Sequence, residues 1–407
     1  MNLATERVGR RGNESGDLPR RWRSVIGRFV PIALAFLPAI GSDGIVCGQE
    51  ERGEEVLKIG VSEGTRESDP TSVAWPAVGS IETLPARIAF GSCGHQSKPM
   101  PVLRTVVDSA PDLFLYLGDN IYGDTRDMEV LRGKYAMLGA KPEFRALAER
   151  VPILSVWDDH DYGENDAGKE YPKKAESREI FFDFWRVPAD DPRREHEGIY
   201  GEHRFEANGR VLQVLLLDTR TFRDRLARNP GDDAAFKNDY RPDPDPTKTL
   251  LGEVQWRWLA ERLRSKADLR IIASSIQFGH EYNGYESWTN LPSEQQRMID
   301  LIRETRANGV LFVSGDVHWG EISRREPWGD EGYPLFDVTA SGLTESWPSV
   351  EPSRFRVGDV VRENHFGRIV IDWTVADPTV RLQIIDRDGT VRNDVSTSVD
   401  ALRFPTP

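Results

Sequence analysis

The sequence predicts a layered α/β fold in which the ends of several strands meet at one edge of a sheet. Short apolar runs, such as 113–117 and 310–314, alternate with segments of helical spacing. Several of these runs end abruptly in residues of the kind that bind metals. The clearest is 153–157, which is followed directly by Asp158-Asp-His-Asp161. Because ligands bind outside the carboxyl ends of strands in an open α/β sheet, we expect these side chains to converge.

The turn after 153–157 places three carboxylates and an imidazole at the end of a buried strand. Such groups repel one another and attract water, and a bound cation removes both problems. A solvated acidic turn is the alternative interpretation. The recurrence of the pattern along the chain favours a metal site. The candidate residues are Cys93, Asp119, Tyr122, Asp159, His160, His280, Asp316 and His318.

Composition limits the size and the partners of the protein. The 407 residues suit one large α/β domain with insertions, and 38% of them are hydrophobic, enough for a sizeable core. A mean hydropathy of −0.52 excludes a protein with several membrane spans. The net charge of −13 argues against a nucleic-acid partner, since binding to the phosphate backbone needs a basic surface. We expect a monomer with a small-molecule substrate, and a phosphate substrate would have to be attracted by local cations rather than by the overall charge.

Residues 1–48 have the features of an export signal. Arg20 and Arg21 precede the apolar stretch 29–40, which is too short and too rich in proline to span a bilayer. The arginine pair is consistent with the twin-arginine route, which exports proteins already folded. A lipidated Cys47 and an uncleaved anchor are the alternatives. We therefore expect an exported protein, periplasmic or extracellular, whose mature chain has no membrane span.

The rest of the chain divides into a linker, a domain and a tail. Residues 49–85 are polar and read as a flexible linker, 86–390 as the folded catalytic domain, and 391–407 as a C-terminal tail. Cleavage of the signal leaves Cys93 as the only cysteine. An exported protein with one cysteine has no internal disulfide, so this thiol needs another role.

The first half of the domain repeats a strand that runs into a turn. Residues 85–91 form a predicted strand that leads to Cys93, and 113–117 form one that ends in Gly118-Asp-Asn-Ile-Tyr122. Each turn is flanked by glycine, which marks a sharp change of direction. Helices are predicted over 100–109, 127–137 and 141–150.

The second half begins with a helix over 175–185 and a hairpin. Ala207-Asn-Gly209 is its turn, because Asn-Gly favours tight hairpin loops. The remaining predicted elements are the hairpin strands 199–205 and 210–217, a charged loop over 224–249, helices over 252–265 and 293–308, a strand at 269–275 that leads to His280, and strand-like runs at 334–338, 368–373 and 380–385 that would complete a second sheet.

The order of motifs between residues 87 and 322 resembles that of a known family. The strings GSC, LGDNIY, WDDHDYG, LLDTRTFR and SGDVHWGEI follow one another as in the PhoD-type alkaline phosphatases. These enzymes form a branch of the metallophosphatase superfamily and are related to purple acid phosphatases. The resemblance implies a four-layer α/β/β/α sandwich of two mixed sheets flanked by helices. It also implies an exported phosphomonoesterase and phosphodiesterase that uses Fe³⁺ and Ca²⁺.

The resemblance assigns roles to the first motifs. Cys93 would replace the usual Asp-x-His pair and bind iron together with Tyr122, while Asp119 would bridge two metals. A thiolate and a phenolate also favour a trivalent metal on chemical grounds. Asp159 would bind the second metal and act in catalysis. His160 would contact the phosphate and stabilise the transition state or protonate the leaving group.

The later motifs are expected to complete the ligand set. Asp316 and His318 would stand in for the final histidine pair of the family. Asn165, followed by Asp166, would serve calcium, which prefers carboxylate and amide oxygens. His280 belongs to the loosest motif, and a core histidine is the alternative there.

Substrate contacts are predicted for His160, Arg220 and Asn120. Arg220 would hold a phosphate bidentately. A structural ion pair between Asp218 and Arg220 is the alternative. Two rival functions also remain open on the sequence alone. One is the same fold specialised for lipid or polymer diesters, and the other is a metal-binding surface protein without catalysis.

Overall fold

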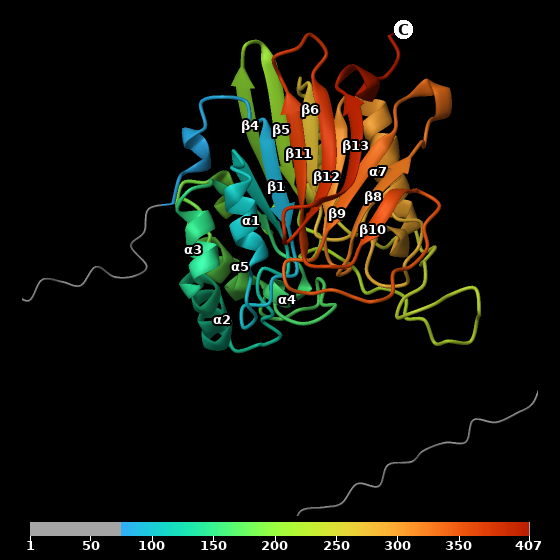
Figure 1. Ribbon diagram of the computed structural model, residues 1–407. Helices are drawn as coiled ribbons and strands as arrows, with labels where there is room; N and C mark the ends of the chain where they lie inside the picture. Colours follow the sequence, from blue (N-terminus) through green and yellow to red (C-terminus); the bar gives the residue numbers. More distant parts are fainter. Residues whose placement is uncertain (1–74, 407) are drawn as a thin grey trace, which may run out of the picture. The chain divides into compact units, whose positions relative to one another are not determined.

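The computed structural model describes residues 75–406 (Figure 1). The predicted export signal, 1–48, and most of the predicted linker lie outside the described residues. Across 75–406, the helices are too short or too polar for any of them to cross a membrane.

Two mixed sheets form the centre of this part of the chain. The first has six strands in the order β13-β12-β11-β1-β2-β3, and the second has seven in the order β10-β8-β9-β7-β6-β5-β4. The strands of the first sheet are β1 (Arg87–Gly91), β2 (Leu113–Leu117), β3 (Ile153–Val156), β11 (His365–Asp372), β12 (Thr379–Asp386) and β13 (Val391–Ser398). Those of the second are β4 (Gly201–Ala207), β5 (Arg210–Leu216), β6 (Leu269–Ala273), β7 (Val310–Ser314), β8 (Gly320–Arg325), β9 (Leu335–Ala340) and β10 (Arg356–Val361).

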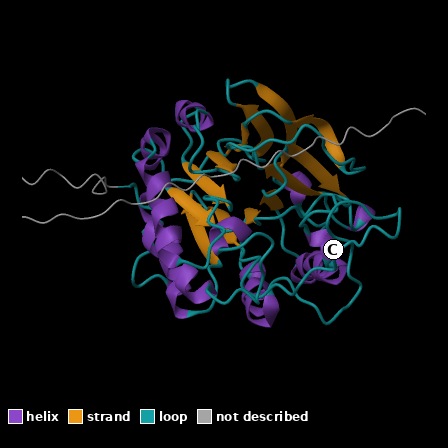
Figure 2. Cartoon of the chain, turned by 90° about the horizontal axis from the view of Figure 1, so that it is seen from below, coloured by secondary structure: helices purple, strands orange, loops and turns teal. Residues whose placement is uncertain are grey.

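Helices flank the sheets. In Figure 1, α1, α3 and α5 cover the left side of the sheets and α7 stands at the opposite side. The view from below shows helices along the left and lower sides of the strands (Figure 2). The predicted fold of two mixed sheets with flanking helices is therefore confirmed. The helices are α1 (Val102–Asp108), α2 (Met128–Ala140), α3 (Pro142–Ala148), α4 (Asp159–Tyr162), α5 (Lys174–Phe184), α6 (Gly252–Arg264) and α7 (Pro292–Thr305). Short 3₁₀ helices lie at Val78–Ser80, Pro192–Glu195, Trp288–Asn290, Gly329–Glu331 and Asp400–Leu402.

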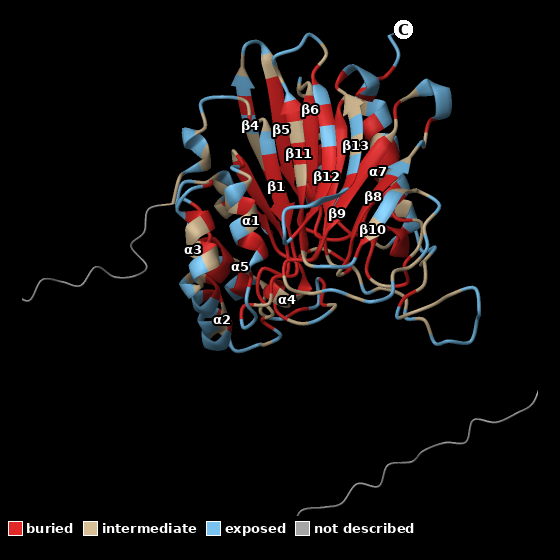
Figure 3. Cartoon of the chain, in the orientation of Figure 1, coloured by how far each residue is buried: buried red, intermediate tan, exposed pale blue. Residues whose placement is uncertain are grey.

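The parallel parts of the sheets explain where the strand ends meet. In the first sheet β1 pairs in parallel with β2, and β2 with β3. In the second, β5, β6, β7 and β9 are parallel neighbours. Strands β2, β6 and β7 are buried along their whole length, and Figure 3 shows buried residues in the central part of the sheets. Parallel strands covered on both faces read as continuous apolar runs, which is why they are visible in the sequence.

The domain extends beyond its predicted C-terminal boundary at 390. Residues 391–398 are strand β13, which pairs antiparallel with β12, so the sheet continues into the predicted tail. This strand is polar and largely exposed, and it carries no apolar pattern. At the N-terminal end of the described residues, Trp75 of the predicted linker packs edge-on against Phe144, with the ring centroids 5.5 Å apart. Strands β8 and β10 are further elements that the sequence does not predict.

Candidate metal centre

The turns after β1, β2 and β7 hold a strained backbone. Cys93, Asp119, Asp316 and His318 have φ angles of 59°, 50°, 74° and 59°. Residues with a Cβ rarely adopt this left-handed region, and each instance costs about 1–3 kcal/mol unless the surroundings compensate. Four strained residues of metal-binding type at the ends of three strands indicate that the fold holds these side chains for a purpose.

Two glycines let the turns approach one another. A Cβ on Gly118, whose φ is 95°, would lie 2.5 Å from the Cβ of Asp158. A Cβ on Gly315 would lie 2.3 Å from the Oγ of Ser92. Any other residue at these positions would push the turns apart, so the two glycines set the spacing of the site.

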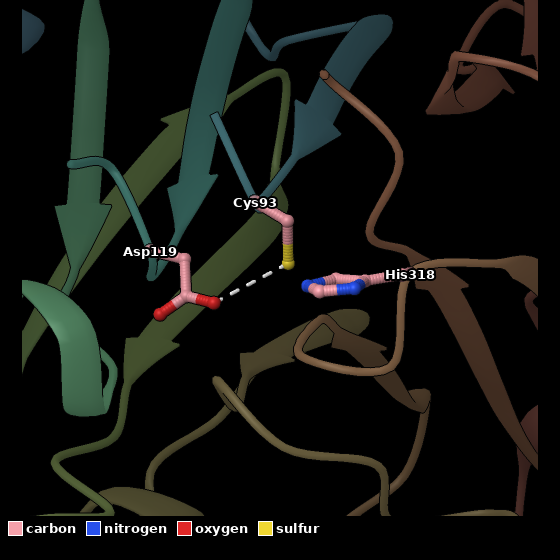
Figure 4. A group of neighbouring side chains, drawn as sticks. All are labelled: Cys93, Asp119 and His318. Atoms are coloured by element: carbon pink, nitrogen blue, oxygen red, sulfur yellow. Dashed lines mark hydrogen bonds between the residues drawn. The ribbon is translucent and has the colours of Figure 1, made fainter. Parts of the chain in front are cut away.

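One group of ligand atoms comes from Cys93, Asp119 and His318, which lie within 4.8 Å of one another. Figure 4 shows the Sγ of Cys93 directed at Asp119, with the ring of His318 beside it. The thiol donates to Asp119 Oδ2 at 3.5 Å. The hydroxyl of Tyr122 lies 3.1 Å from His318 Nε2. The predicted thiolate, carboxylate, imidazole and phenol are thus brought together.

A second group shares a member with the first. Asp119, Asp158, Asp159 and Asp316 also offer ligand atoms within 4.8 Å of one another. Asp119 is the member common to both groups, and this is the position expected of a bridging ligand. Asp158 is not among the ligands that the sequence predicts.

The electrostatics of the site call for positive charge. Burial raises the pKa of the Cys93 thiol well above its usual value, with Asp119 adding to the rise. Burial likewise raises the pKa of Asp119; His160 opposes this rise, and the neighbouring carboxylates add to it. The pKa of Asp316 is raised by burial, Asp158 and Glu286. Cations in this position would remove a repulsion that the described residues leave in place.

Unpartnered polar atoms mark where cations fit. Asp119 Oδ1, Asp159 Oδ1 and His318 Nδ1 are buried, and no hydrogen-bond partner for them is found within residues 75–406. Buried polar atoms are almost always bonded, so each exception needs an explanation. Metal coordination is that explanation here, because the residues that carry these atoms belong to the two groups of ligands.

His160 lies beside the ligands on the short helix α4. Its Nδ1 is 2.7 Å from the Oδ1 of Asp124, and its ring lies 4.2 Å from that of Tyr122. Burial lowers the pKa of His160, but Asp159, Asp119 and the hydrogen bond to Asp124 together raise it to about 11. The pair gives the imidazole a fixed orientation next to the candidate metals.

Asn120 is a support residue of the site. The side chain is fully buried, and its amide nitrogen donates to Val156 O at 2.8 Å and to Asp161 Oδ2. Asp161 also accepts from the backbone N–H groups of Asp158 and Asp119. Asn120 therefore braces the turns of the site through its amide nitrogen, while its Oδ1 is buried without a hydrogen-bond partner among the described residues. Its predicted contact with substrate stays a prediction.

Arg220 is also a support residue. Its guanidinium is completely buried, with Nε 2.6 Å from Asp158 Oδ1 and Nη1 2.5 Å from Glu286 Oε2. The guanidinium therefore pairs with Asp158 and Glu286 and not with Asp218, the alternative partner, and the predicted phosphate contact stays a prediction. The Asp218 side chain instead accepts from the backbone N–H of Arg220 and from Trp157 Nε1.

Two predicted ligands lie outside the ligand groups. His280 Nε2 is 4.0 Å from Glu321 Oε1, and its Nδ1 accepts from the N–H of Tyr282. It belongs to none of the metal-type groups found in the described part of the chain. Asn165 is exposed, whereas Asp166 beside it groups with Asp159 and Glu286. The sequence around His280 contains no pattern that could have shown whether its imidazole lies inside or outside the ligand groups.

A strap over the site, residues 343–347, has no counterpart in the sequence-based prediction. The backbone N–H groups of Leu343 and Thr344 donate to Ser92 O and Cys93 O, both at 3.1 Å, and that of Trp347 donates to His318 O at 3.2 Å. The strap has no periodic apolar pattern and no group of metal-binding residues, so its tryptophan is the only feature by which the sequence could have indicated it.

Asp124 is also missing from the sequence-based prediction. A single exposed aspartate in a loop is common and does not indicate a functional role.

Comparisons with known proteins agree with this geometry. The model of the family described as "PhoD-like phosphatase" matches residues 88–397. "Alkaline phosphatase D" of Bacillus subtilis is 27% identical over 313 residues, which are 65% of this chain and 52% of that protein. The chain thus spans about half the length of this curated relative.

Solved structures show the same fold. A structure titled "Structure of PhoD" matches with a TM-score of 0.61 and 19% identity, over 80% of this chain and 70% of that one. A Plasmodium protein, "GAP50 the anchor in the inner membrane complex", matches with a TM-score of 0.51 and 11% identity, over 79% of this chain and 90% of that one. Since the family model covers most of the chain, the chain belongs to the family of PhoD-like phosphatases.

Proposed function

We propose that this chain is a metal-dependent phosphoesterase of the alkaline phosphatase D type, which hydrolyses phosphomonoesters, phosphodiesters or both. The observation that carries the proposal is the convergence of Cys93, Asp119, Asp159, Asp316 and His318, with unpartnered buried atoms on several of them. Membership of the PhoD-like family and the likeness to a protein named alkaline phosphatase D support it.

The donors fit two kinds of cation. Cys93, Tyr122 and His318 would hold Fe³⁺, because thiolate and phenolate are strong ligands for a trivalent metal. Asp159 and Asp316 would hold Ca²⁺, which prefers carboxylate oxygens, and Asp119 would serve both cations. When bound, the cations would neutralise phosphate oxygens and lower the pKa of water.

The protein's own groups would orient the ester and handle its proton. His160, fixed by Asp124, would donate a hydrogen bond to the phosphate or a proton to the leaving oxygen. Asp159 would stabilise the protonated imidazole of His160, since its carboxylate is a main cause of the raised pKa of that histidine. Arg220 and Asp161 would keep the acidic turns in place from below.

The proposal includes the location and state of the protein. Residues 1–48 would direct export, and the twin-arginine route would suit a metal-loaded enzyme because such an enzyme folds before it crosses the membrane. The mature protein would act as a monomer on small phosphate esters. Fractionation of the native host with an antibody against residues 86–390 would test the location, and a cytosolic protein of full length would contradict it.

The first experiment measures hydrolysis of a chromogenic phosphomonoester and of its diester at alkaline pH. Purified mature protein is assayed as isolated, after a chelator, and after addition of calcium. We expect turnover that the chelator removes and calcium restores. The ratio of the two rates then distinguishes a monoesterase from a diesterase. Absence of turnover in protein shown to hold its metals contradicts the proposal.

A second experiment tests the role of His160. The variant His160→Ala is expected to lose about a hundredfold or more in kcat while it keeps its metals, because general acid–base catalysis contributes on that scale. His196→Ala is a matched control, since His196 stacks on Tyr200 away from the ligands. Unchanged turnover in the His160 variant, with the metals present, would remove this residue from the mechanism.

Iron is tested by spectroscopy. A phenolate bound to Fe³⁺ gives a visible charge-transfer absorption, so the isolated protein should be coloured if Tyr122 is a ligand. The variant Tyr122→Phe should lose that absorption. A colourless wild-type protein that contains iron would contradict the assignment of Tyr122.

A further inference from the structure

The ring of Trp347 contacts the ring of His318, one of the candidate metal ligands. The two ring centroids lie 4.8 Å apart, with the rings at 75° to each other. The ring of Tyr285 also lies beside Trp347, with the centroids 4.7 Å apart and the rings at 56°. Both aromatic side chains are only half-buried. Two large rings are thus partly open to solvent beside a ligand of the metal centre.

The strap fixes this tryptophan relative to the ligands. Thr344 Oγ1 donates to Cys93 O at 3.1 Å and accepts from the N–H of His95 at 2.8 Å. Glu345 forms an ion pair of 2.7 Å with Lys98. The backbone N–H of Trp347 also donates to His318 O. The strap is therefore bonded to both turns that carry the first ligand group, the one with Cys93 and the one with His318. The ring is therefore preorganised, which lowers the cost of binding against it.

A second group of rings near the ligands has a different chemistry. His160 and His95 lie on Tyr122, with ring centroids 4.2 Å and 4.9 Å away. His160, oriented by the 2.7 Å contact of its Nδ1 with Asp124, offers its imidazole to an anionic phosphate. Trp347 and Tyr285 carry no charge and suit the uncharged part of an ester. Planar rings recognise another planar ring by stacking or edge-to-face contact.

We propose that Trp347, backed by Tyr285, forms an aromatic wall that selects phosphate esters whose leaving alcohol carries an aromatic ring. This inference rests on the proposed function and adds the class of its leaving group. With the phosphate between His160 and His318, the ester group extends along the face of Trp347. An aromatic leaving group then gains a contact that an aliphatic group of the same size lacks.

The test compares benzyl phosphate with cyclohexylmethyl phosphate. Both release a primary alcohol of similar size and acidity, so they differ mainly in the flat ring. Methyl phosphate, too small to reach the wall, reports on the metal centre alone. Wild-type protein is expected to favour the benzyl ester in kcat/KM by about three- to tenfold, the range for one aromatic contact. The difference is expected mainly in KM.

Three variants locate the preference. Trp347→Leu should bring the benzyl-to-cyclohexylmethyl ratio close to one, and Trp347→Phe should retain part of it because a ring remains. Trp258→Leu is the matched control, since Trp258 is a half-buried tryptophan of helix α6 that packs on Tyr200. The control should leave the ratio unchanged. Thermal melting and metal content are measured for every variant.

The outcomes separate the two proposals. Each ester is assayed both as the monoester and as its methyl diester, and if metal-loaded wild-type protein hydrolyses neither form of any of them, the proposed function fails. If it hydrolyses all of them without preference, only the aromatic wall is overturned. If Trp347→Leu slows all three esters equally, the tryptophan acts solely by holding His318, and the wall is again overturned. Retention of the preference by Trp347→Phe together with its loss in Trp347→Leu supports the wall even if the leucine variant is less stable.

Discussion

Two sets of buried carboxylates in this domain differ in whether their oxygens have hydrogen-bond partners. In the first set, Asp218 accepts from Trp157 Nε1, from the Thr221 hydroxyl and from several backbone N–H groups. In the second set, Asp119 and Asp159 each keep a buried oxygen for which residues 75–406 supply no hydrogen bond. Burial is common to both sets. The missing partner therefore identifies the site.

The two kinds of carboxylate occur within one turn. Asp161 is bonded to backbone and side-chain donors, while Asp159, two residues earlier, faces the ligands. Asp158 combines both states. Its Oδ1 accepts hydrogen bonds from Arg220 and Ser275, and its Oδ2 has no hydrogen-bond partner among the described residues. Satisfied carboxylates stabilise the fold, and unsatisfied ones are kept at a cost for function. Each prediction below tests this difference.

The largest effect is expected at Asp119, which belongs to both ligand groups. The variant Asp119→Asn should lose about a hundred- to a thousandfold in kcat, because it removes charge where the transition state is stabilised. Its metal content, measured by plasma emission spectroscopy, should fall as well. Full metal content with the wild-type rate would show that an unpartnered oxygen does not mark a ligand.

His365 tests whether a missing partner by itself marks a site. Its Nε2 is buried and without a bond to any described residue, yet it lies outside the ligand groups. Burial lowers the pKa of His365 from 6.5 to about 4. Below pH 6.5 the unfolded chain takes up a proton that the folded chain refuses. Stability is therefore fully present above pH 6.5 and decreases by about 3 kcal/mol as pH falls to 4.

The variant His365→Gln should remove this part of the pH dependence. Urea unfolding of the wild type and the variant at pH 7, 5.5 and 4.5 measures it as the change in their difference. The metal content of the variant should stay normal. Loss of metals would show that a missing partner marks a site even without neighbouring ligands, contrary to the comparison of the two sets.

Asp218 and Asp119 should respond in opposite ways when metals are absent. Asp218→Asn replaces an acceptor with a donor against the N–H of Ile199 and the Thr221 hydroxyl. It should destabilise the protein by about 2 kcal/mol, the cost of buried groups left unbonded. Asp119→Asn should not lower the stability of chelated protein, because it removes repulsion. Urea unfolding in chelator measures both, and equal destabilisation would refute the division into two sets.

The smallest effect is expected at Asp124, which is exposed and acts through His160. Asp124→Asn should lower kcat about tenfold with the metals retained, the usual loss when the partner of a site histidine is removed. Asp127→Asn is the control, because Asp127 caps helix α2 and asparagine caps equally well. An equal loss of activity in both variants would point to a general disturbance of the loop.

The sequence predicts most where strands are buried on both faces. Strands β2, β6 and β7 stand out as apolar runs, and the ligand-type residues that follow β1, β2, β3 and β7 are recognisable from the sequence alone. It predicts less at the edge of the first sheet. Strand β13 is polar and half-exposed, and its pairing with β12 is decided by its neighbour.

By itself the sequence determined which residue types stand at the strand ends, because apolar runs that stop at acidic or sulfur-containing side chains are a local signal. Only the tertiary structure decided how those side chains divide their roles. Arg220 joins Asp158, and Asn120 joins Asp161. These contacts link turns from distant parts of the chain. The physical reason is that the choice of partner depends on which turns the two sheets bring together, and no local pattern contains that information.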